Sequence, residues 1–354
     1  MKKPSFSDHV IQWQKLKGRK HLPWQQNPNK YRVWVSEIML QQTQVATVLK
    51  YYNRFIFSFP DVKTLANEHI DEILHKWSGL GYYRRARLMH KAAQMIINKL
   101  NGRIPSTVEG LMELPGIGRS TAGAIVSLSL NKEAVILDAN VKKILIRFFG
   151  IKSALNEKGT EKKLWELATA SLPNKEFRHY NQGLMDLGAT ICFKSNPKCE
   201  ICPLHSSCRA RIEDITDIIP KKNKTKPPKK IILRLTAFIN QKNQILLEKQ
   251  KESQLWGGLW HLPESKSRTQ ILKRSKKLFL TLFVEKELTS FIYKVSNKEC
   301  HVNITIVKGQ QDKLGSPKNG NMWCDLLEIK NIGTSSLVKR IASKITSELL
   351  DQGE

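Results

Sequence analysis

The sequence predicts a protein of two domains, a mainly α-helical N-terminal part and a smaller α+β domain at the C-terminal end. A chain of 354 residues exceeds the usual size of a single domain. Apolar positions recur at helical spacing over residues 6–210, between short turns marked by Gly and Pro. After a segment rich in Pro and Lys, the pattern changes to the alternation that is typical of strands.

We place the boundaries at residues 1–216 for the helical domain, 217–230 for a linker and 231–354 for the α+β domain. From Pro220 to Lys230 the linker has three prolines and otherwise only polar side chains, so we expect it to be extended and exposed. In the last domain we expect strands at residues 231–239, 244–248 and 301–307. A helix over residues 335–350 follows, with an apolar side formed by Leu337, Val338, Ile341, Ile345 and Leu349.

The charge balance of the chain points to a polyanionic partner. The sequence has 59 Lys and Arg against 31 Asp and Glu, a net charge of +28. Release of counterions from phosphates would supply non-specific affinity for nucleic acid, and the alternative is a lysine-rich surface without a partner. The N-terminus has no apolar run typical of a signal peptide, and no stretch approaches the roughly eighteen apolar residues that span a bilayer. We therefore expect a cytoplasmic protein that does not enter a membrane.

Four of the six cysteines lie within seventeen residues, with the spacing C-x6-C-x2-C-x5-C. Clustered cysteines in the reducing cytosol usually bind metal. Zinc sites of four cysteines usually contain two short pairs, whereas here only one pair is short. Three unequal spacings favour an iron–sulfur cluster, and zinc or two disulfides remain alternatives. The candidate ligands are Cys192, Cys199, Cys202 and Cys208.

A glycine-containing turn between two apolar-periodic stretches predicts a helix–hairpin–helix at about residues 108–130. Gly116 and Gly118 allow the chain to turn sharply and to direct backbone N–H groups outward. Such donors at the N-terminus of the second helix suit a phosphate, so this motif grips the DNA backbone without recognising sequence. An ordinary turn between two helices is the alternative.

Two carboxyl groups stand in contrasting settings. Glu37 lies in the largely apolar segment Tyr31–Leu40, where loss of water would favour its neutral form and suit it to donate a proton. Asp138 precedes a helix that begins near Asn140, and a helix N-terminus favours the ionised form. The alternatives are a solvent-facing glutamate and a simple capping aspartate. Together, an acid and an anion divide the work as in the cleavage of glycosidic bonds.

Several motifs, occurring in order over residues 5–210, resemble those of the MutY-type adenine DNA glycosylases. They are Val35–Val45, Trp77–Tyr83, the hairpin Leu114–Ile125, Ile136–Lys142, and Met185–Ala189 running into the four-cysteine loop. The resemblance implies a helix–hairpin–helix glycosylase fold of two helical subdomains, with one 4Fe–4S cluster on the four cysteines. It also implies a bacterial-type, nucleoid-associated monomer that acts on double-stranded DNA containing A:8-oxoguanine or A:G mismatches.

The resemblance further implies a hydrolase that removes the mispaired adenine after the base leaves the duplex. Glu37 would protonate the purine, Asp138 would stabilise the oxocarbenium-like sugar, and Asn140 would orient Asp138. Residues that match the adenine pocket are Arg19, Trp24, Ser120 and Gln182, and those that match DNA contacts are Gln41, Gln42, Tyr82, Gly116, Gly118 and Lys142.

Position 120 separates two related activities. Bifunctional relatives that resemble endonuclease III carry lysine there and cut the strand through a Schiff base. Ser120 cannot do so, which favours a monofunctional glycosylase. Lys142 lies near Asp138 in the sequence and could trap an abasic sugar, although we favour a phosphate contact. A bifunctional glycosylase/lyase and a non-catalytic DNA-binding iron–sulfur protein remain alternatives.

The C-terminal domain resembles the NUDIX-like module with which such glycosylases recognise 8-oxoguanine, on the segment Leu255–Pro263. No R-E-x-x-E-E array follows, so the carboxylates for metal-dependent pyrophosphate hydrolysis are missing. Where the family usually has Phe-Ser-His, this chain has Val295, Ser296 and Asn297, so we expect Ser296 and Asn297 to recognise 8-oxoguanine with weaker discrimination. Ala139 replaces a usual glycine and would be strained if its φ were positive.

Overall fold

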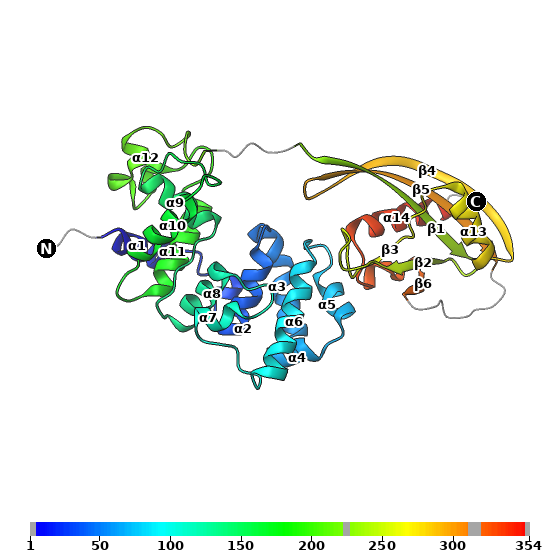
Figure 1. The fold of residues 1–354 in the computed structure, drawn as a ribbon, viewed down its shortest axis with the longest axis horizontal. Helices are drawn as coiled ribbons and strands as arrows, with labels where there is room; N and C mark the ends of the chain where they lie inside the picture. Colours follow the sequence, from blue (N-terminus) through cyan, green and yellow to red (C-terminus); the bar gives the residue numbers. More distant parts are fainter. Residues whose placement is uncertain (1–4, 222–226, 311–319, 351–354) are drawn as a thin grey trace. The chain divides into compact units, whose positions relative to one another are not determined.

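The computed structural model describes residues 5–221, 227–310 and 320–350 (Figure 1). It divides into two compact units. The first comprises residues 1–67 and 88–225, and the second comprises residues 68–87 and 226–354. Residues 222–226 of the expected linker lie outside the described residues. No helix in the described part of the chain combines the length and apolar character needed to cross a bilayer.

The first unit is helical, as expected. Its helices are α1 (Phe6–Lys17), α2 (Lys30–Leu40), α3 (Val45–Ser58), α4 (Val62–Asn67), α7 (Val108–Met112), α8 (Arg119–Ala124), α9 (Ala139–Phe148), α10 (Thr160–Ala170), α11 (Phe177–Thr190) and α12 (Arg209–Ile212). Short turns of other helix types are η1 (Pro23–Gln25), η2 (Ile125–Ser129), η3 (Cys199–Ile201) and η4 (His205–Ser207). Helix α6 (Arg84–Lys99) begins in the second unit and ends in the first.

Helix α11 is the centre of the first unit. It packs against α1, α9 and η2 (Figure 1), and all residues from Tyr180 to Gly188 are buried. Glycines permit these close approaches, because a Cβ at Gly183 would lie 2.8 Å from Val10 Cγ1, and one at Gly188 would lie 2.6 Å from Asn140 Cβ. The helix thus brings the N-terminal segment and the start of α9 together.

The second unit contains α5 (Ile70–Trp77) and a six-stranded sheet. Its strands are β1 (Lys229–Asn240), β2 (Gln244–Lys249), β3 (Trp260–His261), β4 (Thr281–Val295), β5 (Lys298–Gln310) and β6 (Asn321–Asp325). The order is β3-β2-β1-β5-β4, with β6 paired to β2. Strands β1 and β5 are parallel, and the other pairs are antiparallel. The expected α+β class is confirmed.

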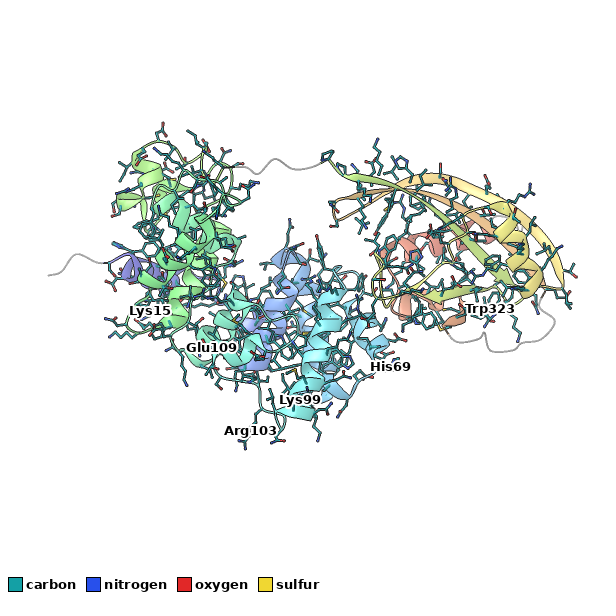
Figure 2. The ribbon with its side chains drawn as sticks, in the orientation of Figure 1. Lys15, His69, Lys99, Arg103, Glu109 and Trp323 are labelled. Carbon is teal, nitrogen blue, oxygen red and sulfur yellow. The ribbon has the colours of Figure 1, made fainter. Side chains whose placement is uncertain are left out.

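Helices α13 (Arg268–Leu278) and α14 (Ser336–Leu350), with the turn η5 (Glu328–Asn331), complete this unit. A core cluster consists of Phe238, Leu246, Ile271, Phe279 and Val307, and the ring of Trp323, which Figure 2 labels, packs against it. The apolar side expected on the last helix is buried at Leu337, Val338, Ile341 and Ile345, whereas the side chain of Leu349 lies outside the described ones. Helix α13 and strands β3, β4 and β6 were not predicted from the sequence.

Candidate active site

Glu37 lies in the last turn of α2, a helix that begins where the Asn29 side chain accepts a hydrogen bond from the Arg32 N–H at 2.8 Å. Its neighbours Ser36 and Ile38 are buried. Burial, and secondly the negative charge of Asp138, raise the pKa of Glu37 to about 8. The carboxyl therefore keeps its proton at neutral pH, as the apolar segment predicts.

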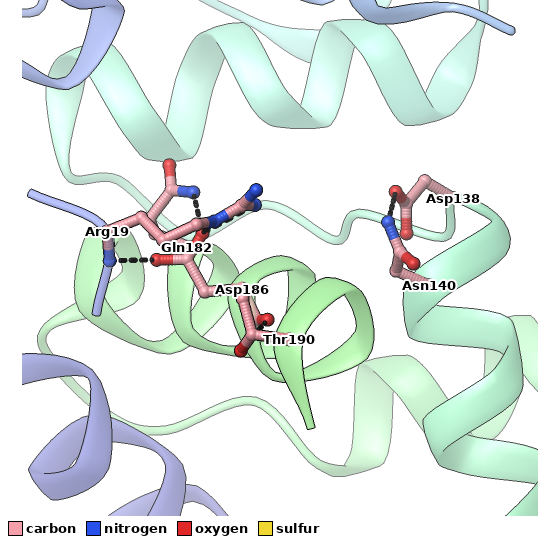
Figure 3. Close-up of polar contacts among 6 residues, drawn as sticks. All are labelled: Arg19, Asp138, Asn140, Gln182, Asp186 and Thr190. Carbon is pink, nitrogen blue, oxygen red and sulfur yellow. Dashed lines mark hydrogen bonds and ion pairs between the residues drawn. The ribbon is translucent and has the colours of Figure 1, made fainter. Parts of the chain in front are cut away.

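Asp138 is the N-cap of α9. Its Oδ1 accepts a hydrogen bond from the Val141 N–H at 2.7 Å, and its Oδ2 accepts one from Asn140 Nδ2 at 3.3 Å (Figure 3). Burial raises the pKa of Asp138, and these hydrogen bonds act in the opposite direction. The position of Asp138 before α9 predicted a bias toward the ionised form, whereas burial has the larger effect and shifts the pKa upward. The negative charge of Asp138 nevertheless contributes to the raised pKa of Glu37.

The start of α9 is held by α11. Lys143 Nζ donates to the Gly188 carbonyl at 2.6 Å, and burial lowers the pKa of this lysine. Asn140 packs directly on Gly188. Ala139 is the first residue of α9 and is not among the residues with positive φ, so the strain considered for this position does not arise.

The first turn of α8 contacts both carboxyl-bearing segments. Ser120 Oγ accepts a hydrogen bond from the Leu137 N–H at 3.1 Å, directly before Asp138. Thr121 Oγ1 accepts one from Gln41 Nε2 at 3.4 Å, just after the helix that carries Glu37. Because these contacts come from consecutive residues, α8 sets the spacing between the two segments.

The predicted hairpin is present between α7 and α8. Gly116 has a φ of 84°, and a Cβ there would lie 2.9 Å from Leu88 Cβ. Gly118 is the N-cap of α8 and provides no side-chain cap, which leaves the first N–H groups of the helix available to a phosphate. The motif was expected to run to about residue 130 as ordinary helix, whereas α8 ends at Ala124 and continues as the π-helical η2.

A cavity of about 260 Å³ lies beside these elements. Its lining includes Trp24, which is buried edge-on against Tyr52 at 5.4 Å between ring centroids, and Gln182. Neither Arg19 nor Ser120 is among its described lining residues. Arg19 instead forms an ion pair with Asp186 of α11, at 2.8 Å from Nη2 to Oδ1, and no role was predicted for Asp186 from the sequence.

Three further expected DNA contacts lie in different surroundings. Gln42, between α2 and α3, has a φ of 54°. Tyr82 belongs to the second unit, has a φ of 49°, and is 46 % exposed with the Arg85 guanidinium over its ring. Lys142 Nζ forms an ion pair with Glu161 Oε1 at 2.7 Å, a contact with which a phosphate would have to compete.

The four cysteines of the loop surround one small cavity, and all four are free thiols. Arg147 of α9 contacts the loop through its guanidinium group. Its guanidinium donates to Cys192 Sγ at 3.3 Å, to two loop carbonyls at Phe193 and Lys194, and to those of Thr216 and Ile219. Burial raises the pKa of Cys202 to about 12, so a metal would have to displace the proton. Among the described residues, no three His, Cys, Asp or Glu side chains lie close enough to hold a single ion.

Ser296 and Asn297 form the turn between β4 and β5. Ser296 has a φ of 54°, and the Asn297 carbonyl accepts a hydrogen bond from the Lys229 N–H at 2.8 Å. The two residues are therefore presented at the end of a long antiparallel hairpin.

Comparison with family models gives two matches. Residues 35–170 match the HhH-GPD superfamily of base excision DNA repair proteins, and residues 235–344 match the NUDIX domain. The first range contains both Glu37 and Asp138. The second range begins within β1 and ends within α14.

The adenine DNA glycosylase of Buchnera aphidicola from Acyrthosiphon pisum is 40% identical over 344 residues, which are 96% of this chain and 97% of that protein. The chain belongs to the adenine DNA glycosylase family. As a member of that family it is a glycosylase enzyme of base excision DNA repair. The human adenine DNA glycosylase is 38% identical over 216 residues, 58% of this chain and 39% of its own length.

Solved structures support the helical fold of this glycosylase. A thermostable thymine-DNA glycosylase is 30% identical and superposes with a TM-score of 0.54, covering 59% of this chain and 95% of its own. Endonuclease III in a non-covalent DNA complex, 22% identical, has a TM-score of 0.50 over 59% of this chain and 94% of its own, and shares the fold.

Proposed function

We propose that the protein is a monofunctional glycosylase that hydrolyses the N-glycosidic bond of adenine paired with 8-oxoguanine or guanine. One observation carries the proposal: Glu37 keeps its proton at neutral pH, with a pKa of about 8, beside the charge of Asp138. An acid for the leaving group and an anion for the sugar are what hydrolysis of a glycosidic bond requires. A DNA-binding protein without catalysis has no need for a carboxyl that keeps its proton at neutral pH.

The reaction follows from these two groups. The adenine leaves the duplex at an unstacking cost of roughly a few kcal/mol. Glu37 donates its proton to N7 of the purine, which weakens the bond to the sugar. The carboxylate of Asp138, oriented by Asn140 Nδ2, stabilises the positive charge that develops on the sugar. Water then adds to the sugar carbon, and the proton that it releases restores the acid.

The test is single-turnover cleavage of a duplex with adenine opposite 8-oxoguanine. We expect Glu37→Gln to lose excision, because glutamine has the same shape and no proton to donate. Glu133→Gln, which changes an exposed glutamate of the same unit, serves as the control and should behave as the wild type. Undiminished excision by Glu37→Gln would refute the assignment, and no excision by the wild type would favour a DNA-binding role.

The absence of a lysine at position 120 supports a monofunctional enzyme. The hydroxyl of Ser120 accepts a hydrogen bond from the Leu137 N–H. The nearby amine of Lys142 forms an ion pair with Glu161. We expect reduction with borohydride during turnover to trap little protein on DNA, and Lys142→Ala to remove what is trapped. Strand cleavage as fast as base removal would establish the bifunctional alternative instead.

We propose that Cys192, Cys199, Cys202 and Cys208 hold one 4Fe–4S cluster, supported by four thiols around one cavity. When bound, the cluster would crosslink the loop and hold its lysines and arginines, such as Lys198 and Arg209, toward DNA. Analysis of the purified protein should find about four iron and four sulfide per chain. One zinc per chain without sulfide would contradict this.

We further propose that residues 1–216 act as the catalytic domain, that 217–230 link it to an 8-oxoguanine-recognition domain at 231–354, and that the enzyme works as a monomer on nucleoid DNA in the cytoplasm. The hairpin at Gly116 and Gly118 would bind the backbone, Gln41 and Gln42 would occupy the vacated stack, and Tyr82 would also contact DNA. With Ser296 and Asn297 in the recognition turn, A:8-oxoguanine should be preferred over A:G less strongly than in relatives with Phe-Ser-His. Matched duplexes test this directly.

A further inference from the structure

Residues 68–87 belong to the second unit together with residues 226–354, although the chain returns to the first unit directly after them. This segment contains α5, the first turn of α6 and, between these helices, residues 78–83, which we call the Tyr82 loop. The side chains of Ile73, Leu74 and Trp77 in α5 are buried. A segment from the first quarter of the sequence is therefore held by residues near its C-terminal end.

Arg87, in the first turn of α6, attaches the far end of this segment. Its guanidinium donates from Nη1 to the Gly257 carbonyl, and from Nη2 to the Glu252 carbonyl at 3.3 Å. The side chain is only 8 % exposed, and burial lowers the pKa of Arg87. A buried guanidinium needs hydrogen-bond acceptors, and the main chain of the C-terminal residues supplies two of them.

The chain at Gly258 can approach Arg87 because glycine occupies this position. Gly258 has a φ of 81°, and a Cβ there would lie 3.2 Å from Arg87 Cδ and 3.4 Å from Leu74 Cδ1. A side chain would be strained by the backbone and crowded by α5 and α6. Gly258 lies within the segment 255–263, on which the resemblance to a NUDIX-like module depends. Part of that motif thus serves a contact with residues 68–87.

A second set of contacts attaches the near end of the Tyr82 loop. Ser78, which directly follows α5, donates from Oγ to the Thr334 carbonyl at 2.8 Å, in a buried position. Asp71, in the first turn of α5, forms an ion pair with Lys249 of β2. The Tyr82 loop is therefore bound to the C-terminal residues on both of its sides.

Contacts within the segment fix the tyrosine relative to these two attachments. The Gly81 carbonyl accepts hydrogen bonds from Trp77 Nε1 and from Arg85 Nη2, each at 3.1 Å. The guanidinium of Arg85 lies over the ring of Tyr82, at 5.4 Å from its centroid. Since the ring itself is exposed, a shift of either attachment would move an aromatic surface that faces solvent.

We propose that Arg87 is a positioning residue through which the C-terminal residues hold the ring of Tyr82 in place to unstack bases of the bound DNA. The inference rests on the proposed function, since it takes Tyr82 as a DNA contact. Unstacking a base step costs free energy, and a side chain that yields to the duplex cannot impose it. The ring and the turn of Ser296 and Asn297 belong to the same unit.

The test uses the full-length protein and a duplex with adenine opposite 8-oxoguanine and 2-aminopurine beside the mispair. The fluorescence of 2-aminopurine rises when the base unstacks, so it reports distortion without requiring cleavage. With protein in excess, so that all DNA is bound, we expect Arg87→Met to weaken the rise in fluorescence. Single-turnover excision should slow about tenfold, which corresponds to 1.4 kcal/mol.

A double-mutant cycle with Tyr82→Ser separates positioning of the ring from a general structural role. If Arg87 acts through the ring, Arg87→Met should change either readout by less than about twofold once Tyr82 is replaced. Lys99→Met is the matched control, because it removes one positive charge from the exposed last residue of the same helix. It should behave as the wild type.

If Arg87→Met does not fold, Ser78→Ala decides, because it removes only the hydroxyl that donates to Thr334. Wild-type values in the folded variants would overturn the inference. Equal losses with and without the ring of Tyr82 would also overturn it, as would a wild type that leaves the fluorescence unchanged. A wild type that unstacks the DNA but excises no adenine would contradict the proposed function alone, and the cycle is then judged by fluorescence.

Discussion

Replacing Glu37 with glutamine should make the protein more stable at alkaline pH while abolishing excision. The surroundings of this carboxyl disfavour its ionised form. Ionisation of Glu37 therefore lowers the free energy of unfolding. Glutamine keeps the shape and has no charge to bury. The gain in stability should therefore depend on pH in a way that a simple packing effect would not.

The sign and size follow from the pKa of Glu37, which rises from 4.5 to about 8 on folding. Below pH 4.5 both the folded and the unfolded states carry the proton, and the substitution has no electrostatic effect. Between pH 4.5 and about 8 the unfolded state ionises while the folded state does not, so the wild type loses stability as pH rises. Above pH 8 the loss is complete, at about 3–5 kcal/mol, since one unit of pKa corresponds to about 1.4 kcal/mol.

The assay is calorimetric unfolding of the wild type, Glu37→Gln and the control Glu133→Gln at several pH values from 5 to 9. The difference between Glu37→Gln and the wild type should be small at the acid end and should grow up to about pH 8. Glu133→Gln should follow the wild type throughout, because that side chain is exposed. A difference that is the same at both ends of the range would refute the argument, as would a destabilised Glu37→Gln at alkaline pH.

Three further substitutions test other parts of the site. Gly188→Ala should slow excision at least about tenfold with the fold retained by circular dichroism, because its Cβ would lie 2.6 Å from Asn140 Cβ; a wild-type rate would contradict this contact. Arg147→Lys should lose iron faster under a chelator, because an ammonium group cannot replace a guanidinium that donates to Cys192 and to the carbonyls of Lys194 and Thr216. Unchanged iron retention would exclude that role. Asn297→His should raise the preference for A:8-oxoguanine over A:G by about 2- to 10-fold, the value of one hydrogen bond, and no change on matched duplexes would remove this residue from recognition.

Local features of this chain were predictable because their causes are local. The Asp138 cap, the Gly116 turn and the apolar side of the last helix each depend on a few neighbouring residues, and all three are present in the structure. All four cysteines of the loop line one cavity, and their role as ligands of a cluster stays a prediction. The balance of forces on Asp138 was not predictable in this way, since burial depends on segments that are distant in the sequence.

What the sequence alone determined is therefore the family, the fold class of the two parts of the chain, and the chemical types at the site. The tertiary structure decided which of those groups act on one another. It placed Asp138 near enough to raise the pKa of Glu37, tied Leu137 to Ser120, and paired Lys142 with Glu161. It also revealed Asp186, which lies 167 residues from its partner Arg19. Charges and hydrogen bonds act over a few ångströms in space, and only the packing of α11 against its neighbours brings such residues within that distance.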